Sequence, residues 1–437
     1  RRRNCYFTVF RAHFCDETTS RGNNQSGRAM FEWVIILFLG SGLVYGLFSR
    51  RLQRRNISSP MMMVLSGALI ALPLGIWHEA PLRALSGGLH FATRFAEMTL
   101  AIILFLDAAV LNYRKEQAAK NIALRLLLIG LPLTILATWG FIVGLDDSVR
   151  RIPALILALI VSPTDAALGR PVLENRDVPD PVRQGINIES GLNDGLVLPV
   201  FTTAVLLEAN LLSNGHQGWI KEALLEISAG AGIGIGCGFV LGKIVNHVVT
   251  RDMIVDRFER LLGVLAAILI YLLAEQLGGN GFVAAFAGGL SLNISSDRVR
   301  DTIESFGEAE AELLTMLTFF VFGMIVVPAV YESWTWEMLA FSVASLVILR
   351  PLCVWICMIG SPYSPGEKLY IGWFGPRGIA SVIYMLIMAT LIDPSEFMPL
   401  FAAGTMIICI SIVAHGISAA PASRALVRYL AKRSAKD

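Results

Sequence analysis

Charged residues are scarce in this sequence. They make up 16% of its 437 residues, against about 25% in an ordinary soluble domain. Hydrophobic residues make up 55%, and they are grouped into long runs. This composition excludes an ordinary soluble globular protein and favours an all-α polytopic membrane protein.

The chain also lacks the residue patterns of several enzyme and metal-binding classes. Its six cysteines include no Cys-x-x-Cys pair, and Cys353 and Cys357 are simply one helical turn apart. The His-Glu-x-x-His, Gly-x-Ser-Gly and Gly-x-Gly-Asp patterns of intramembrane proteases do not occur. We therefore predict that the protein is not an enzyme, has no cofactor and does not bind nucleic acid.

Thirteen apolar segments are candidate membrane spans by their length and hydropathy. They cover residues 31–49, 60–77, 94–111, 122–144, 152–169, 184–208, 226–249, 260–277, 280–293, 309–330, 338–360, 367–392 and 397–418. The polar, Arg-rich residues 1–29 precede Met30 and are predicted to be a disordered extension. The membrane domain is then 30–418, and 419–437 form a short basic tail.

Positive charge is unevenly placed between these segments. Arg50, Arg51, Arg54 and Arg55 follow the first segment, and five Lys and Arg residues lie in the tail. Most other loop Lys and Arg residues also follow odd-numbered segments. Because basic loops remain in the cytoplasm, we predict a cell (inner) membrane protein with its N-terminus outside and its C-terminus cytoplasmic.

Two of the predicted spans contain strong helix breakers near their middle. Ser162-Pro163-Thr164-Asp165 interrupts the fifth, and Gly375-Pro376-Arg377-Gly378 interrupts the twelfth. Interrupted spans at corresponding places in two halves of a chain indicate a transporter binding site. We therefore predict inverted repeats, with spans four to six matching eleven to thirteen and the two broken helices crossing. The opposite charges of Asp165 and Arg377 suit this crossing.

The sixth span carries a polar stripe in an otherwise apolar helix. Glu189 stacks on Asn193, and Ser190 stacks on Asp194, because each pair is four residues apart. Carboxylates at membrane depth are costly and indicate a functional site by default. We expect the stripe to face the broken fifth span, so that Asp194 approaches Asp165.

The oxygen atoms of this predicted cluster suit a small hard cation. Asp194 and Asp165 offer carboxylates, while Thr164, Ser190 and Asn193 offer neutral oxygens; thiolate and imidazole ligands are absent. If Asp194 holds either Na⁺ (or Li⁺) or a proton, but not both, one-for-one electroneutral exchange follows. A passive cation channel is the alternative from another class of transport protein.

Two buried cations need partners in this arrangement. Arg350 lies in the eleventh span, and Glu189 is its natural mate, which leaves Asp194 free to bind ions. Arg377 lies at the second break. Glu97 and Asp107 in the third span have no role that the sequence assigns.

These motifs resemble the monovalent cation:proton antiporters of the NhaP/NHE type over nearly the whole chain. The resemblance rests on Ser162–Asp165, on Glu189-Ser190-Gly191-Leu192-Asn193-Asp194 and on Phe374–Gly378. In that family an Asn-Asp pair marks electroneutral exchangers. The alternative function is a K⁺/H⁺ antiporter of the same fold.

The resemblance implies a fold of thirteen spans with an ion-binding core and a dimerisation domain. It assigns the core to helices within 122–208 and 338–418, and the dimer scaffold to helices within 31–111 and 226–330. It also implies Na⁺ binding at Asp194, Asp165, Ser190 and Thr164, a Glu189–Arg350 salt bridge, and Arg377 beside the second break. Homodimers that move their cores through the lipid bilayer are expected.

Overall fold

The protein is almost entirely helical where its structure is described. The computed structural model describes residues 23–71, 86–110, 117–145, 149–165, 168, 175, 177–212, 219–251, 253–295, 297–391 and 397–434. All regular secondary structure within these ranges is helical. The predicted all-α fold is thus confirmed.

The described helices follow one another along the chain in three stretches. In the first half they are α2 (Asn23–Arg54), α3 (Ser59–Ala71), α5 (Ser86–Val110), α6 (Gln117–Arg125), η1 (Leu126–Gly130), α7 (Leu131–Leu145), α8 (Arg151–Val161) and α10 (Asp180–Leu212). The middle of the chain forms α11 (Trp219–Thr250), α12 (Asp256–Gln276), α13 (Gly281–Ser295), α14 (Asp297–Val321), η2 (Phe322–Val326), α15 (Val327–Val330) and η3 (Tyr331–Ser333). The last part forms α16 (Trp336–Ala344), η4 (Ser345–Leu349), α17 (Arg350–Cys357), α18 (Pro365–Trp373), α19 (Ile379–Leu391) and α20 (Met398–Ser434).

The predicted spans fall on these helices, but their number stays a prediction. Within the described residues, seven helices are long and apolar enough to cross a membrane, and five further apolar helices are shorter. Large apolar side chains remain exposed on the outside, as at Leu47 (72%) and Leu269 (65%). Such a surface is stable in lipid rather than in water, which makes this a multi-pass membrane protein.

Two predicted boundaries differ from the helices. Helix α2 begins at Asn23, before the predicted start of order at Met30, whereas residues 1–22 of the predicted extension lie outside the described residues. At the other end, α20 continues through the predicted tail to Ser434 as one helix, with Lys432 and Arg433 in its last turn. Basic residues there suit the negative end of the helix dipole.

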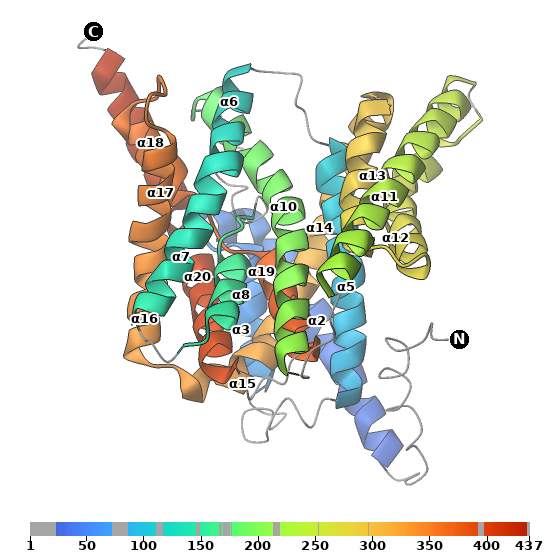
Figure 1. Ribbon diagram of the computed structural model, residues 1–437, viewed down its shortest axis with the longest axis horizontal. Coiled ribbons are helices and arrows are strands. Elements are labelled where there is room, and N and C mark those ends of the chain that lie inside the picture. Colours follow the sequence, from blue (N-terminus) through green and yellow to red (C-terminus); the bar gives the residue numbers. More distant parts are fainter. Residues whose placement is uncertain are drawn as a thin grey trace.

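The helices form two neighbouring groups. Helices α11, α12 and α13 pack on one another and α13 packs on α5. In the other group, α20 packs on α8, α16 and α18, while α17 packs on α7 and α18. Figure 1 shows α11–α13 on one side and α7, α16 and α17 on the other, with α8, α10 and α19 between them. Helix α10 contacts both groups, since it packs on α6, α8, α5 and α13.

Three helices contain a π-helical turn for the same local reason. Each of η1, η2 and η4 ends two residues before a proline, which is Pro132, Pro328 or Pro351. The residue before each proline bonds five residues back, as Arg350 N does to Ser345 O. Because proline cannot donate to the carbonyl four residues back and its ring clashes there, widening the preceding turn relieves the clash.

Two of these π turns lie in the fourth and eleventh predicted spans. Helix α17 packs against η1, and α7 packs against η4, so each widened turn contacts the matching helix of the other half. Arg125 just before η1 donates to Cys357 O (3.2 Å) and Ile359 O (2.8 Å). The contact satisfies carbonyls at the end of α17, in keeping with an inverted repeat.

Candidate functional site

The two interrupted helices cross at their breaks. Helix α8 ends at Val161, and residues 374–378 separate α18 from α19. Asp165 N donates to Pro376 O (2.9 Å), while Arg377 Nη1 donates to Ser162 O (2.8 Å) and Pro163 O (3.3 Å). Each break therefore satisfies part of the backbone of the other, and non-helical backbone within a membrane requires such partners. The part of the fifth span after Asp165 lies largely outside the described residues.

Each half-helix end meets a charge of opposite sign from the other break. Asp165 Oδ2 accepts a hydrogen bond from Ile379 N (2.8 Å) at the positive start of α19. Arg377, which is fully buried, places its guanidinium at the negative end of α8. The side chains thus complement the two helix dipoles crosswise.

Two glycines of the second break make this close crossing possible. A Cβ at Gly375 would overlap the Arg350 guanidinium, and a Cβ at Gly378 would overlap the Asp165 carboxylate. Any larger residue would therefore push a charged group out of its place. The Gly-Pro-Arg-Gly motif supplies close approach as well as a helix break.

The polar stripe of α10 lies against the first break through Thr164. Ser190 Oγ donates to Thr164 O (2.7 Å), and Asn193 Nδ2 donates to Thr164 Oγ1 (2.7 Å). Thr164 Oγ1 in turn donates to Glu189 Oε2 (3.0 Å). All four residues are buried. The structure thus brings together three stripe residues and the break that they were expected to face.

Glu189 and Arg350 form a buried ion pair beside this cluster. Arg350 Nη2 lies 3.4 Å from Glu189 Oε2, and the two side chains are only 3% and 2% exposed. Arg350 directly follows the π turn η4 and is the first residue of α17. A buried charge pair of this kind depends on both partners.

Asp194 is the least satisfied acid at the crossing. Its Oδ1 is buried and has no hydrogen-bond partner among the described residues, and the same holds for Asn193 Oδ1. The acids that act electrostatically on Asp194 are Asp165, Asp107 and Glu189. Buried oxygens without donors on two successive residues, near further acids, favour binding of a cation or a proton.

Sequence reasoning did not identify Tyr384. Its hydroxyl donates to the backbone carbonyl of Asp194 (2.9 Å), and its ring stacks on Phe201 with centroids 4.5 Å apart. Tyr384 therefore ties α19 to the turn of α10 that carries Asp194. An aromatic residue in an apolar helix gives no sequence signal for such a contact.

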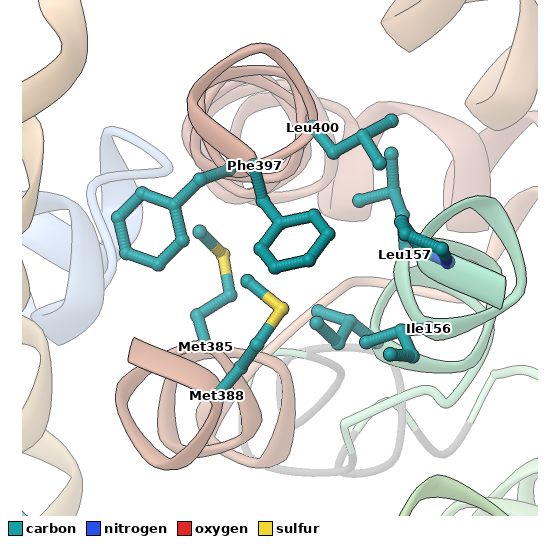
Figure 2. A pocket seen from close by; sticks show the side chains of 9 residues that line it. Ile156, Leu157, Met385, Met388, Phe397 and Leu400 are labelled. Carbon is teal, nitrogen blue, oxygen red and sulfur yellow. The ribbon is translucent and has the colours of Figure 1, made fainter. Parts of the chain in front are cut away.

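An apolar pocket lies next to the crossing, between α8, α19 and the start of α20. Ile156, Leu157, Met385, Met388, Phe397 and Leu400 are among its lining residues. Figure 2 shows the two methionines and Phe397 pointing into it. Because its lining is hydrocarbon and thioether, this pocket does not suit a hard cation.

Two half-helices that cross with compensated ends, beside an acid with a buried and unsatisfied oxygen, define a membrane transporter of the broken-helix class. The family model of the transmembrane sodium/hydrogen exchangers matches residues 34–425. The chain belongs to this sodium/hydrogen exchanger family. It is a family of transporters rather than enzymes.

Characterised relatives are distant but similar over most of the chain. The chain is 24% identical over 368 residues to the K⁺/H⁺ antiporter NhaP2 of Shewanella sp. (strain ANA-3), which covers 82% of this chain and 62% of the relative. It is 26% identical over 360 residues to the K⁺/H⁺ antiporter NhaP of Alkalimonas amylolytica, covering 80% and 61%. The chain thus spans about three fifths of the length of these relatives.

Solved structures share the fold. The sodium proton antiporter MjNhaP1 from Methanocaldococcus jannaschii at pH 8 superimposes with a TM-score of 0.73, and the alignment covers 92% of this chain and 99% of that chain. The sequence identity is 21%. This match confirms the predicted fold class.

Proposed function

We propose that the protein is an electroneutral antiporter that exchanges Na⁺ or Li⁺ for H⁺, with both ions competing for Asp194. The observation that supports this most is the buried Asp194 Oδ1, which has no hydrogen-bond partner among the described residues. A carboxylate oxygen buried without a hydrogen-bond donor is stabilised when it binds either a cation or a proton. Since the two occupy the same oxygen, they cannot be bound together.

The proposed cation ligands come from α10 and from the first break. Asp194, Ser190 and Asn193 lie on α10, and Thr164 and Asp165 lie in the break that follows α8. Asp165 also accepts a hydrogen bond from Ile379 N through Oδ2, which fixes its carboxylate at the crossing. Carboxylate, hydroxyl and amide oxygens are ligands of hard monovalent cations. Arg377 stays at the carbonyl end of α8 and helps to balance the charge.

Competition for a single carboxylate supports a one-for-one exchange. Asp165, Asp107 and Glu189 all act electrostatically on Asp194, so this site favours a positive ion. One Na⁺ or one proton bound at Asp194 adds the same single charge, so the loaded core carries the same charge in both directions.

Potassium is the second candidate substrate, with K⁺/H⁺ antiport on the same site. Relatives that the chain matches over 80% or more of its length are named K⁺/H⁺ antiporters. The ligand types are equally suited to K⁺, which is larger and needs a wider cavity. The choice between the cations therefore depends on cavity size rather than on ligand chemistry.

The proposal includes the assembly around the site. Helices within 122–208 and 338–418 would form the moving core, and helices within 31–111 and 226–330 would form the scaffold of a homodimer. Basic loops and the basic end of α20 favour an inner membrane protein with a cytoplasmic C-terminus. A passive cation channel is disfavoured because one acid holds either ion.

Cation-induced proton release from everted membrane vesicles tests the proposal. Na⁺, Li⁺ and K⁺ are added separately to vesicles that have been acidified by respiration, and recovery of the interior pH is followed with a fluorescent probe. Wild-type protein should release protons with at least one cation, and Asp194→Asn should release none.

Asp177→Asn is the matched control, because Asp177 is an exposed acid in the loop before α10 and has no place in the proposed site. It should exchange like the wild type. Exchange that survives in Asp194→Asn would contradict the assignment, and cation flux without proton movement would favour a channel.

A further inference from the structure

A histidine on α20 contacts the second break but belongs to neither the proposed ion ligands nor the charge pairs. His415 is 2% exposed and lies one turn after Ser411 on the face of α20 that meets the end of α18. Any role for His415 in holding this break in shape rests on the proposed function, since the break is part of the same site.

His415 bridges two backbone groups at the break. Its Nε2 lies 2.9 Å from Trp373 O, the last carbonyl of α18. Its Nδ1 lies 3.1 Å from Ser411 Oγ, and Arg377 N donates to the same Ser411 Oγ (2.7 Å). A chain of hydrogen bonds therefore spans the break from Trp373 to Arg377 by way of α20.

The groups at the two ends of this chain of hydrogen bonds fix the direction of the bond at each end. A carbonyl can only accept, so Trp373 O requires a proton on His415 Nε2. A backbone N–H can only donate, so Ser411 Oγ accepts from Arg377 N and has its own proton left for His415 Nδ1. The neutral Nε2–H tautomer satisfies both ends.

A second proton on the ring is disfavoured by its surroundings. Nδ1 also lies 2.9 Å from Ser411 O, which could accept from it. However, the charged groups that act on the ring are Arg377 and Arg350, and both are cations. An imidazolium would add a third buried positive charge with no acid assigned to it.

We propose that His415 is a positioning residue that, as the neutral Nε2–H tautomer, works with Ser411 to hold the second break and thereby Arg377. Without His415 and Ser411, the Trp373 carbonyl at the end of α18 and the Arg377 amide would lose these hydrogen bonds at the non-helical break. Fixing them also fixes Pro376 O, which accepts from Asp165 N. The effect of His415 thus reaches the first break and the proposed cation ligands.

Nitrogen NMR of the wild-type protein tests the tautomer directly. The protein has six histidines, and ¹⁵N-histidine labelling with His415→Gln as the assignment variant identifies the signals of His415. We expect protonated Nε2 and unprotonated Nδ1, unchanged between about pH 6 and about pH 8, where a free histidine titrates. An Nδ1–H tautomer, or protonation of both nitrogens in this range, would overturn the proposal.

Three substitutions at His415 separate the two hydrogen bonds of the ring. His415→Leu removes both, whereas Gln can still donate near the place of Nε2 to Trp373 O, and Asn can still accept near the place of Nδ1 from Ser411. Exchange should fall by roughly tenfold or more in His415→Leu, as for loss of buried hydrogen-bond partners, and by less in the Gln and Asn variants. Adding Ser411→Ala should remove the advantage of Asn over Leu and leave that of Gln.

His247→Leu is the matched control, because His247 is exposed near the end of α11, and it should exchange like the wild type. Equal losses in the Leu, Gln and Asn variants, or full activity in His415→Leu, would contradict the positioning role. The NMR result does not depend on which ion is exchanged, so failure of this inference is distinguishable from failure of the proposed antiport.

Discussion

At the scale of single residues, removing one member of the Glu189–Arg350 pair should lower the stability of the protein. Both side chains are almost fully buried, so removing one leaves the other charge uncompensated. We expect Arg350→Ala to lower the free energy of unfolding by about 3–5 kcal/mol. Thermal unfolding in detergent, followed by loss of the monodisperse peak, measures the effect. Arg424→Ala, at an exposed position of α20, should unfold like the wild type.

Replacing both members of the pair should be better tolerated than replacing one. A Glu189→Gln/Arg350→Met variant has no unpaired buried charge, and apolar replacements of buried pairs are often neutral in stability. Its unfolding temperature should therefore lie above that of Arg350→Ala. If the double variant is less stable than Arg350→Ala, an unpaired buried charge is not the cause of the lost stability in the single variant.

At the scale of helices, the crossing depends on the absence of side chains at the second break. Gly378→Ala would place a methyl group where the Asp165 carboxylate lies, and should detach that carboxylate from the start of α19. We predict a loss of exchange of roughly tenfold or more, because a partly buried carboxylate loses its hydrogen bond with Ile379 N. Vesicle assays at matched protein levels measure the loss.

Gly140→Ala is the control for this substitution. Gly140 lies within α7, and a Cβ there meets no atom within 4 Å. Alanine favours a helix over glycine by about 1 kcal/mol, so this variant should be as stable as the wild type or slightly more so. A Gly378→Ala protein that exchanges as fast as Gly140→Ala would contradict the proposed role of the close crossing.

The sequence allowed the breaks to be predicted but not the π turns. Pro163 and the Gly375-Pro376 pair remove hydrogen bonds and helix propensity at identifiable places, and both helices are interrupted there. Prolines 132, 328 and 351 also remove a backbone hydrogen bond, yet at these places the helix continues with one π-helical turn instead of breaking. Which response occurs depends on how neighbouring helices pack, and hydropathy patterns do not contain that information.

The arrangement of side chains at the site was predictable only where spacing along one helix determines it. Glu189, Ser190 and Asn193 share a face of α10 because of helical periodicity, and all three reach Thr164. The contacts of Tyr384 with Asp194 and of His415 with Trp373 join residues far apart in the chain. Such contacts result from tertiary packing, so no local sequence pattern predicts them.

At the scale of the whole molecule, the proposed motion requires α10 to shift against α13. Gly195 on α10 lies so close to Phe286 on α13 that a Cβ at Gly195 would overlap the phenyl ring. Cysteines at both positions are therefore within reach of a disulfide. In a background without the native cysteines, Gly195→Cys/Phe286→Cys should stop exchange when oxidised and regain it when reduced. Undiminished exchange by the oxidised protein would show that these two helices do not move apart.

The central claim is that one carboxylate, Asp194, carries either a cation or a proton across the membrane. The most direct test measures both fluxes in proteoliposomes while the membrane potential is clamped at several values. We predict one proton for each cation, rates that do not vary with the potential, and no exchange in Asp194→Asn. A net current, a ratio other than one, or continued exchange without the Asp194 carboxylate would contradict this claim.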